Sequence, residues 1–376
     1  MALGLGTDGL MPQRIALYDL TYDQLAQLLH DWGEPRFRAE QVWRWLYQSL
    51  VDDFEEMTNL PQRLRERLSS ETDLKMLTVQ AEQASPGGQT RKVLFGLRDG
   101  NTIESVLMRY RDRQTACISS QVGCGMGCVF CATGQGGLVR NLSAGEIVAQ
   151  VIHFARESRS IEIEHAAEQG VKTQAHKQPI SNIVLMGMGE PLANYAATWQ
   201  AIETLTDGRG YNLGARRITL STVGLVPVIR RLAEERLPVN LAVSLHAPDD
   251  ELRNELVAVS RHYPLNDLMA AVREYVAKTA RRVTFEYALI DGVNDSPQYA
   301  QKLADMLDGL LCHVNLIPLN PTPGSTLRPS RRERVEAFRD LLVDSGIATT
   351  VRMRRGIGIS AGCGQLRQRQ VDIALR

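Results

Sequence analysis

From residue 115 onward, short apolar runs alternate with longer stretches of helical periodicity. Strands that alternate with helices in this way indicate a parallel sheet joined by right-handed crossovers. With a first strand at 115–120 the runs make six β/α units, fewer than the eight of a closed barrel. The sequence therefore predicts an α/β fold, a partial (β/α)6 barrel. The other predicted strands are Asn182–Met188, Arg217–Thr222, Val239–Leu245, Val283–Ile290 and Val314–Leu319, and the predicted helices lie near 144–157, 194–205, 225–235, 264–279 and 296–308.

The part of the chain before residue 115 follows a different pattern. Thr21 and Gln24 form a capping-box motif at the start of a helical stretch. Two alternating runs then flank Asp99-Gly100, which is a hairpin signal. We therefore predict four parts: an N-terminal helical accessory domain at 1–76, a β-hairpin extension at 77–114, the barrel at 115–354 and a C-terminal tail at 355–376. The polar segment 158–179 is predicted to be an irregular surface insertion.

Three cysteines follow the first barrel strand at the spacing C-x3-C-x2-C: Cys124, Cys128 and Cys131. Glycines at 123, 125 and 127 let the backbone curl, so the thiolates can converge on one centre. A [4Fe–4S] cluster normally takes four cysteines, and three would leave one iron open for a small molecule. The alternatives are a zinc site completed by Cys117, because structural zinc takes four ligands, or three buried thiols.

Polar residues stand where several predicted strands end. Because the carboxyl ends of parallel strands in a β/α barrel meet on one face, and active sites lie there, these residues predict a ligand pocket. Glu190 could accept a hydrogen bond from the amino group of a bound amino acid. Ser221 and Asn320 could instead be helix N-caps, and His246 could be a structural histidine.

Three further cysteines lie outside the loop. Cys117 lies on the first barrel strand, and Cys363 lies between glycines near the C-terminus. A mobile, exposed thiol is reactive when its pKa is lowered, so these two are candidates for thiol chemistry. Cys312, at the start of the sixth strand, is expected to be buried and inert.

Composition limits the class of protein. The chain has 376 residues, zero formal net charge and six cysteines, which do not make a disulfide framework in a chain of this length. We predict no membrane segment, a cytoplasmic location and a monomer. Any nucleic-acid surface must be a local patch, because phosphate contacts need clustered cations. The candidate clusters, each of which could also be a solvated face, are Arg216-Arg217, Arg281-Arg282, Arg331-Arg332-Arg334 and Arg352-Arg354-Arg355.

These motifs together resemble the radical S-adenosylmethionine (SAM) adenine-C2 methyltransferases of bacteria, which act on 23S rRNA and, in some members, on tRNA. The resemblance runs from about Leu20 to Leu366, and the chain differs from many relatives in lacking acidic residues at 356–360. The matching stretches are Gln121–Cys124, Met186–Pro191, Ser244–Pro248, Asn315–Pro318 and Cys363–Leu366.

The resemblance implies a radical SAM barrel and a dual use of SAM. One SAM would methylate Cys363, and a second, bound to a [4Fe–4S] cluster on the three loop cysteines, would yield a 5′-deoxyadenosyl radical. The activated methyl group of Cys363 would add to adenine C2, and Cys117 would then release the RNA by forming a disulfide with Cys363. The target base would have to be single-stranded or splayed out, and an electron donor such as flavodoxin would be needed.

The resemblance also implies roles for single residues. Glu104 would be the proton acceptor, although it could instead be an outward-facing glutamate on a hairpin strand. The alternative functions are an adenine-C8 methyltransferase, which shares the cysteines but often has Glu-Ala where this chain has Glu190-Pro191, and a metal-stabilised RNA-binding protein without catalysis. The SAM site would be lined by Gly189, Glu190, Ser221, Ser244, Leu245, His246 and Asn320.

Overall fold

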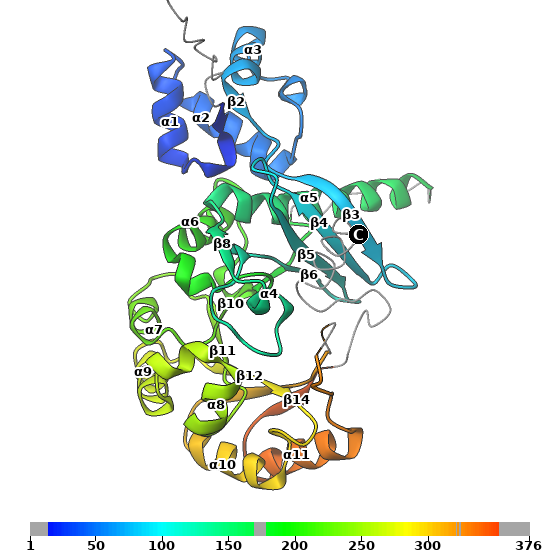
Figure 1. Ribbon diagram of the computed structural model, residues 1–376. Coiled ribbons are helices and arrows are strands. Elements are labelled where there is room, and N and C mark those ends of the chain that lie inside the picture. The colour runs from blue at the N-terminus through cyan, green and yellow to red at the C-terminus, as the bar shows by residue number, and fades with distance from the viewer. Residues whose placement is uncertain (1–13, 169–177, 321, 323–324, 353–376) are drawn as a thin grey trace, which may run out of the picture.

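The computed structural model describes residues 14–168, 178–320, 322 and 325–352. Its N-terminal part is a small helical module at one end of the molecule (Figure 1). Thr21 caps the first helix with both halves of the predicted capping box, and Pro61 is the N-cap of the third helix. The elements are β1 (Ile15–Ala16), α1 (Tyr22–Asp31), α2 (Phe37–Arg44), α3 (Gln62–Glu71) and β2 (Thr72–Asp73).

A curved ten-stranded sheet runs through the rest of the molecule in the order β14-β13-β12-β11-β10-β9-β6-β5-β4-β3 (Figure 1). Strands β6 and β9 to β14 pair in parallel, which confirms the six predicted barrel strands. The sequence also predicts a further strand at 347–353, and β14 lies within it. The strands are β3 (Thr78–Ala84), β4 (Thr90–Gly96), β5 (Thr102–Arg109), β6 (Gln114–Cys117), β9 (Asn182–Leu185), β10 (Ile218–Thr222), β11 (Asn240–Ser244), β12 (Val283–Leu289), β13 (Cys312–Pro318) and β14 (Thr349–Val351).

Strands β3, β4 and β5 extend the barrel sheet by antiparallel pairing. The connection is the β5–β6 pair, in which Val106 lies opposite Cys117. The predicted hairpin is therefore continuous with the barrel through hydrogen bonds. The division of the chain at residues 76, 114 and 354 stays a prediction.

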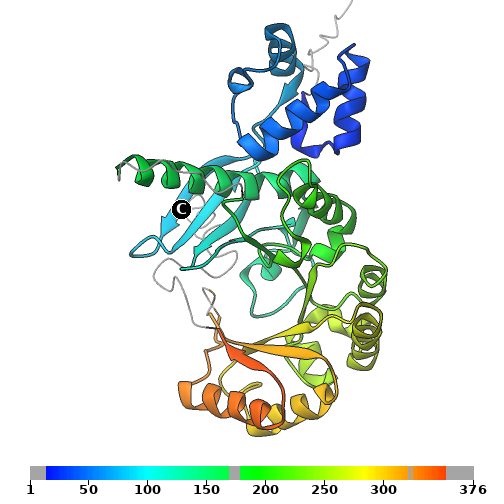
Figure 2. The ribbon, with the colours of Figure 1, turned by 180° about the vertical axis from the view of Figure 1, so that it is seen from behind.

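Helices follow the parallel strands, as β/α alternation requires. They cover the outer face of the curved sheet (Figures 1 and 2). Among the described residues no helix is long and apolar enough to cross a membrane. The helices are α5 (Ala144–Glu168), α6 (Tyr195–Thr206), α7 (Val226–Leu232), α8 (Asp250–Leu256), α9 (Leu265–Thr279), α10 (Pro297–Leu307) and α11 (Arg332–Asp344).

The predicted irregular insertion is wrong for residues 158–168, because α5 continues through them. This stretch has no glycine or proline and is rich in helix-forming Glu and Ala. Its apolar periodicity fades because the buried residues of α5 end at Ser158. The earlier part of α5 packs on the sheet, where Phe154 contacts Phe95 of β4.

The helical module is fixed to the barrel where α5 begins. The Gly145 amide donates to Asp19 Oδ1 at 2.6 Å. A Cβ atom at Gly145 would lie 2.7 Å from the Asp19 backbone nitrogen, so only glycine allows this approach. Farther along α5, the Arg156 guanidinium donates to Leu50 O at 2.7 Å and to Tyr18 Oη at 2.9 Å. These contacts give the module a defined position on the sheet.

Candidate active site

The three loop cysteines lie between two short paired strands, β7 (Gln121–Gly123) and β8 (Leu138–Asn141). The Cys124 amide donates to Gly137 O at 2.8 Å and closes the base of the loop. Gly123 has φ +78°, and a Cβ atom there would lie 2.0 Å from Gly137 O. Only glycine can occupy this position, so the predicted role of glycine in curling the loop holds at the residue before Cys124.

Cys124 and Cys128 are buried and Cys131 is half-buried, and the three thiols are close enough to influence one another. Burial raises the pKa of Cys124 to about 11 and that of Cys128 to about 12, and the thiols of Cys131 and Cys124 add to the rise at Cys128. The thiols of Cys124 and Cys128 therefore stay protonated unless a cation binds them, and a coordinated thiol loses its proton. The loop therefore suits a positively charged metal group.

The donor set fits an iron–sulfur cluster better than a single ion. Within the described ranges, no three His, Cys, Asp or Glu side chains converge closely enough to hold one metal ion. This disfavours the zinc alternative, and Cys117 lies on β6 rather than in the loop. A [4Fe–4S] cluster spreads its ligands because each thiolate binds a different iron. Apolar neighbours, including Leu252, Leu256 and Leu319, pack around Cys128 and would shield such a cluster from water.

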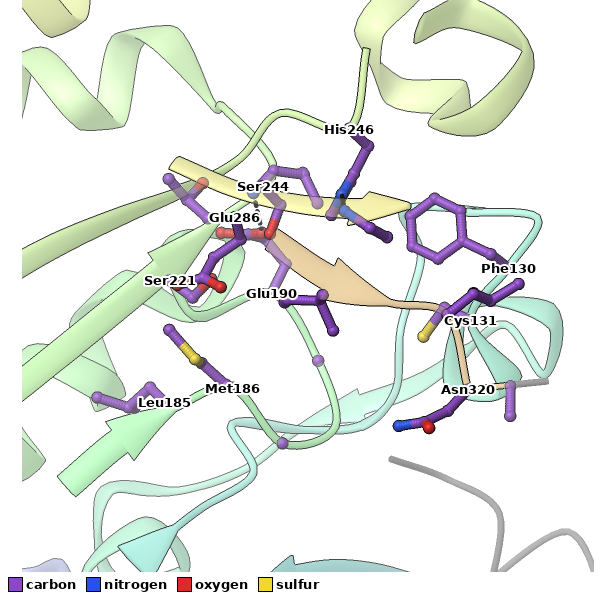
Figure 3. Close-up of a pocket in the computed structure, with 18 of the residues that line it drawn as sticks. Phe130, Cys131, Leu185, Met186, Glu190, Ser221, Ser244, His246, Glu286 and Asn320 are labelled. Atoms are coloured by element: carbon purple, nitrogen blue, oxygen red, sulfur yellow. Dashed lines mark hydrogen bonds between the residues drawn. The ribbon is translucent and has the colours of Figure 1, made fainter. Parts of the chain in front are cut away.

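A cavity of about 280 Å3 opens at the carboxyl ends of the parallel strands. Phe130 and Cys131 of the cysteine loop lie across it from Leu185 and Met186, with Asn320 on their side (Figure 3). The loop and the strand ends therefore share one pocket. Leu245 is not among its lining residues; its side chain is fully buried and its amide donates to Glu286 O at 3.0 Å. The predicted SAM-site residues that line the cavity are Gly189, Glu190, Ser221, Ser244, His246 and Asn320.

Glu190 is the buried acid of this pocket. Its carboxylate accepts from the Val223 amide at 2.9 Å and from the Leu192 amide at 3.1 Å. Burial nevertheless raises the pKa of Glu190 to about 7, because these hydrogen bonds offset only part of the cost of burying the charge. A cation brought next to this carboxyl group would restore the ionised form. Glu190 is thus suited to bind an ammonium group.

His246 is held in a neutral form. Its Nδ1 atom accepts from the Ala288 amide at 3.0 Å, so the proton of the neutral ring lies on Nε2. Burial lowers the pKa of His246 to about 3. Its ring packs edge-on against Phe130, with the ring centroids 4.7 Å apart (Figure 3). The histidine is both a satisfied structural residue and a wall of the pocket, so the two predicted alternatives are not exclusive.

Glu104 does not face outward. Its side chain is buried on β5, and Glu104 Oε2 lies 2.6 Å from Lys92 Nζ of β4, which is also fully buried. Because Lys92 lies opposite Val106 and Val106 lies opposite Cys117, these side chains share one face of the sheet with Glu104. The alternative of a solvent-facing glutamate is therefore wrong.

Lys92, Val106 and Cys117 form a row across three neighbouring strands, and Cys117 is the member next to the barrel pocket. Val184 is its partner on β9, and Met186, two residues farther along, lines the cavity. Burial raises the pKa of Cys117, whereas Arg352, a hydrogen bond from the Met186 backbone and Lys92 favour the thiolate. The thiol thus lies among charged groups at the edge of the pocket.

Comparison with known proteins identifies the family. The family model of the ribosomal RNA large subunit methyltransferase N-terminal domain matches residues 15–74, and that of the radical SAM superfamily matches residues 118–304. A protein of Chloroflexus aurantiacus, named as a probable dual-specificity RNA methyltransferase RlmN, is 54% identical over 95% of this chain and 93% of its own length. The chain belongs to the RlmN family.

Other RlmN relatives agree along almost the whole chain. The protein of that name from Symbiobacterium thermophilum is 50% identical over 95% of this chain and 92% of its own. The crystal structure of a radical SAM methyltransferase from Sphaerobacter thermophilus superposes with a TM-score of 0.86 at 52% identity, covering 93% of this chain and 98% of that one. The predicted fold and recognition are confirmed.

The cysteines Cys117, Cys124, Cys128, Cys131 and Cys312 all carry free thiols, so the predicted disulfide is not supported. Its other member, Cys363, lies outside the described residues. Cys312 is buried, as predicted.

The structure adds two charged residues to the pocket that sequence reasoning missed, Glu286 and Arg352. Glu286 accepts from Asn315 Nδ2 at 2.7 Å, and burial raises its pKa while Arg352 opposes the rise. A glutamate inside the apolar run Val283–Ile290 was a usable signal, because an acid in a buried strand needs a partner. Arg352 gave no such signal, because it stood in a cluster assigned to RNA phosphates.

Proposed function

We propose that this RlmN family member methylates C2 of an adenine in 23S rRNA, adenosine 2503, and an adenosine of some tRNAs. The observation that carries the proposal is the three-cysteine loop, whose Cys131 and Phe130 line the pocket at the strand ends together with Glu190. Relatives named as dual-specificity RNA methyltransferases, at 50% identity and more, support the substrate class.

The proposed cofactors are a [4Fe–4S] cluster on Cys124, Cys128 and Cys131 and SAM in the adjoining pocket. When bound, they supply radical chemistry, which an unreactive ring carbon such as adenine C2 requires. The chain contributes the binding groups. Glu190 accepts from the ammonium group of the SAM methionine moiety, and His246 Nε2–H offers a fixed donor. The apolar wall of Phe130 and Leu319 limits access of water.

Thiol chemistry and proton transfer complete the proposal. Cys363 carries the methyl group, Cys117 resolves the enzyme–RNA adduct, and Glu104 accepts a proton. The position of Glu104 supports this last role, because its carboxyl group lies 2.6 Å from Lys92 Nζ on the face of the sheet that carries Cys117. We further propose a monomer that works in the cytoplasm with an electron donor such as flavodoxin.

The raised pKa of Glu190 predicts that SAM binding depends on pH. Binding to the carboxylate requires loss of its proton, so the affinity should fall about tenfold for each pH unit below 7. In Glu190→Gln, binding should be weaker and should depend much less on pH between about 5.5 and 7, because the carboxyl group of Glu190 is no longer there to titrate. Anaerobic calorimetric titration of the cluster-loaded proteins with SAM at each pH measures the affinity of the wild type and of the variant. A wild-type affinity that is flat across this range would contradict the role of Glu190.

The same ionisation has a linked effect on folding. Because the folded-state pKa of Glu190 lies above its ordinary value, its contribution to stability is present at low pH and is lost as pH rises through 7. Without SAM, the wild-type free energy of unfolding should therefore decline more steeply from pH 5 to 7 than that of Glu190→Gln. Denaturant titration at each pH is the measurement.

The direct test of function is anaerobic methylation. Cluster-loaded protein is mixed with SAM, a reductant and a 23S rRNA fragment or tRNA, and the digested RNA is analysed by mass spectrometry. The expected product is 2-methyladenosine from both substrates. Methylation at adenine C8 would replace the proposed reaction with the alternative one, and RNA binding without any methylation would favour the non-catalytic alternative.

A further inference from the structure

A second cavity, of about 670 Å3, lies at the opposite end of the barrel from the SAM pocket. It is lined by residues at the amino ends of three neighbouring strands: Thr219 of β10, Asn240 of β11 and Thr284 of β12. Because β10, β11 and β12 are parallel, their amino ends open on the face away from the catalytic groups. Nothing in the proposed reaction uses this cavity.

Three arginines line this cavity, and no acidic residue does. They are Arg216, before β10, and Arg281 and Arg282, before β12. In the part of the chain that the structure describes, none of the three belongs to an ion pair. Burial lowers the pKa of Arg281, Tyr275 opposes this shift, and the positive charge of Arg216 lowers the pKa further. The cavity therefore concentrates uncompensated positive charge.

The other arginine clusters of the sequence behave differently. Arg332 pairs with Glu336 at 2.7 Å, and Arg334 pairs with Asp295 at 2.8 Å, so carboxylates of the chain already occupy these guanidinium groups. Arg352 belongs to the SAM pocket. Arg354 and Arg355 lie outside the residues that the structure describes. Among the described clusters, the Arg216 and Arg281-Arg282 groups line a shared cavity.

The cavity is also a fixed arrangement of donors. Asn240 Oδ1 accepts from Arg281 Nη2 at 3.3 Å, and Asn240 Nδ2 donates to Arg216 O at 2.7 Å, which joins the two arginine segments. Ala280, with φ +52°, turns the chain from the end of α9 into Arg281. The carbonyl end of α9 offsets some of the positive charge beside it, but it does not neutralise three full charges.

We propose that this cavity is a phosphate-binding site. Guanidinium groups bind phosphoryl oxygens in bidentate pairs, and the hydroxyls of Thr219 and Thr284 add donors at the floor. The phosphate can come from an RNA segment remote from the target adenosine, a source that rests on the proposed function, or from a free phosphorylated small molecule.

The test uses cluster-loaded full-length protein and two probes. Inorganic pyrophosphate binding is measured by calorimetry, and binding of a 23S rRNA fragment is measured at salt concentrations from about 50 to 200 mM. The variant is Arg216→Gln/Arg281→Gln. The matched control is Arg217→Gln, because Arg217 is exposed and adjacent to Arg216 but does not line the cavity. Cluster absorbance and circular dichroism check folding. If the double variant does not fold, Arg282→Gln replaces it as the test variant.

Each outcome decides the proposal. If the free molecule is the source, the double variant loses about tenfold or more in pyrophosphate affinity and the control does not. If RNA is the source, the slope of log affinity against log salt falls by about 1 for each arginine removed, beyond any change in the control. Equal behaviour of the double variant and the control with both probes overturns the site. Failure of the wild-type protein to bind RNA would count against the proposed function instead, because the pyrophosphate measurement needs no RNA.

Discussion

Cys128→Ser is expected to lose the iron–sulfur cluster and to reduce methylation by far more than 100-fold. Even residues that only support a metal ligand cost about 10–100-fold when replaced, and Cys128 is one of only three proposed ligands. A serine hydroxyl is a poor ligand for iron in a site that depends on thiolates. Iron content, absorbance in the visible range and methylation rate of the anaerobically reconstituted variant are the measurements.

Cys312→Ser is the matched control for this experiment. Cys312 is as buried as Cys128, with 8% and 7% of their surfaces exposed, but it lies at the start of β13, outside the cysteine loop. This variant should keep its iron and its activity. A Cys128→Ser protein with full iron content and wild-type methylation would contradict the proposal that this loop holds the cluster.

Cys117→Ala is expected to accumulate a covalent enzyme–RNA adduct and to lose nearly all turnover. Without the resolving thiol, the RNA stays attached to Cys363, because no other described cysteine lies in the row formed by Lys92, Val106 and Cys117. Denaturing gel electrophoresis after anaerobic reaction with SAM and RNA detects the adduct.

Two companion variants make the assignment specific. Cys363→Ala should form no adduct, because the proposed methyl carrier is missing, and Cys312→Ala should turn over normally. Since burial raises the pKa of Cys117, release of the RNA by the wild-type protein should also speed up with rising pH until the thiolate predominates. Free methylated RNA from Cys117→Ala at the wild-type rate would defeat the assigned role.

The barrel could be predicted from sequence because local patterns carry it. Each parallel strand needs a short apolar run, and each crossover helix needs a stripe at helical spacing. The predicted helix at 264–279 and the observed α9, Leu265–Thr279, agree to within one residue. The strands agree less closely at their ends: Asn182–Met188 was predicted, and β9 ends at Leu185 because the following glycines lead into the pocket loop.

Other features could not be predicted, because they depend on contacts between segments that are far apart in the sequence. Lys92 and Glu104 follow a strand alternation that allows either face to be buried. Their ion pair lies on the face that carries Cys117, opposite the face on which Phe95 packs against α5. Leu245 belongs to a motif whose neighbours line the pocket, but strand alternation turns its side chain into the core. Residues 158–168 are helical but have no apolar stripe, so a prediction that relies on apolar periodicity did not identify them as helix.

The sequence by itself determined the cysteine loop, the order of strands and helices and most of the pocket residues. These follow from covalent spacing and from hydrophobic periodicity, both of which are local properties. Only the tertiary structure decided that Glu190 is buried with a raised pKa, that Lys92 meets Glu104, and that Arg216 and Arg281 converge on one cavity. Burial and charge proximity depend on residues far apart in the chain, so they become definite only when the sheet is assembled.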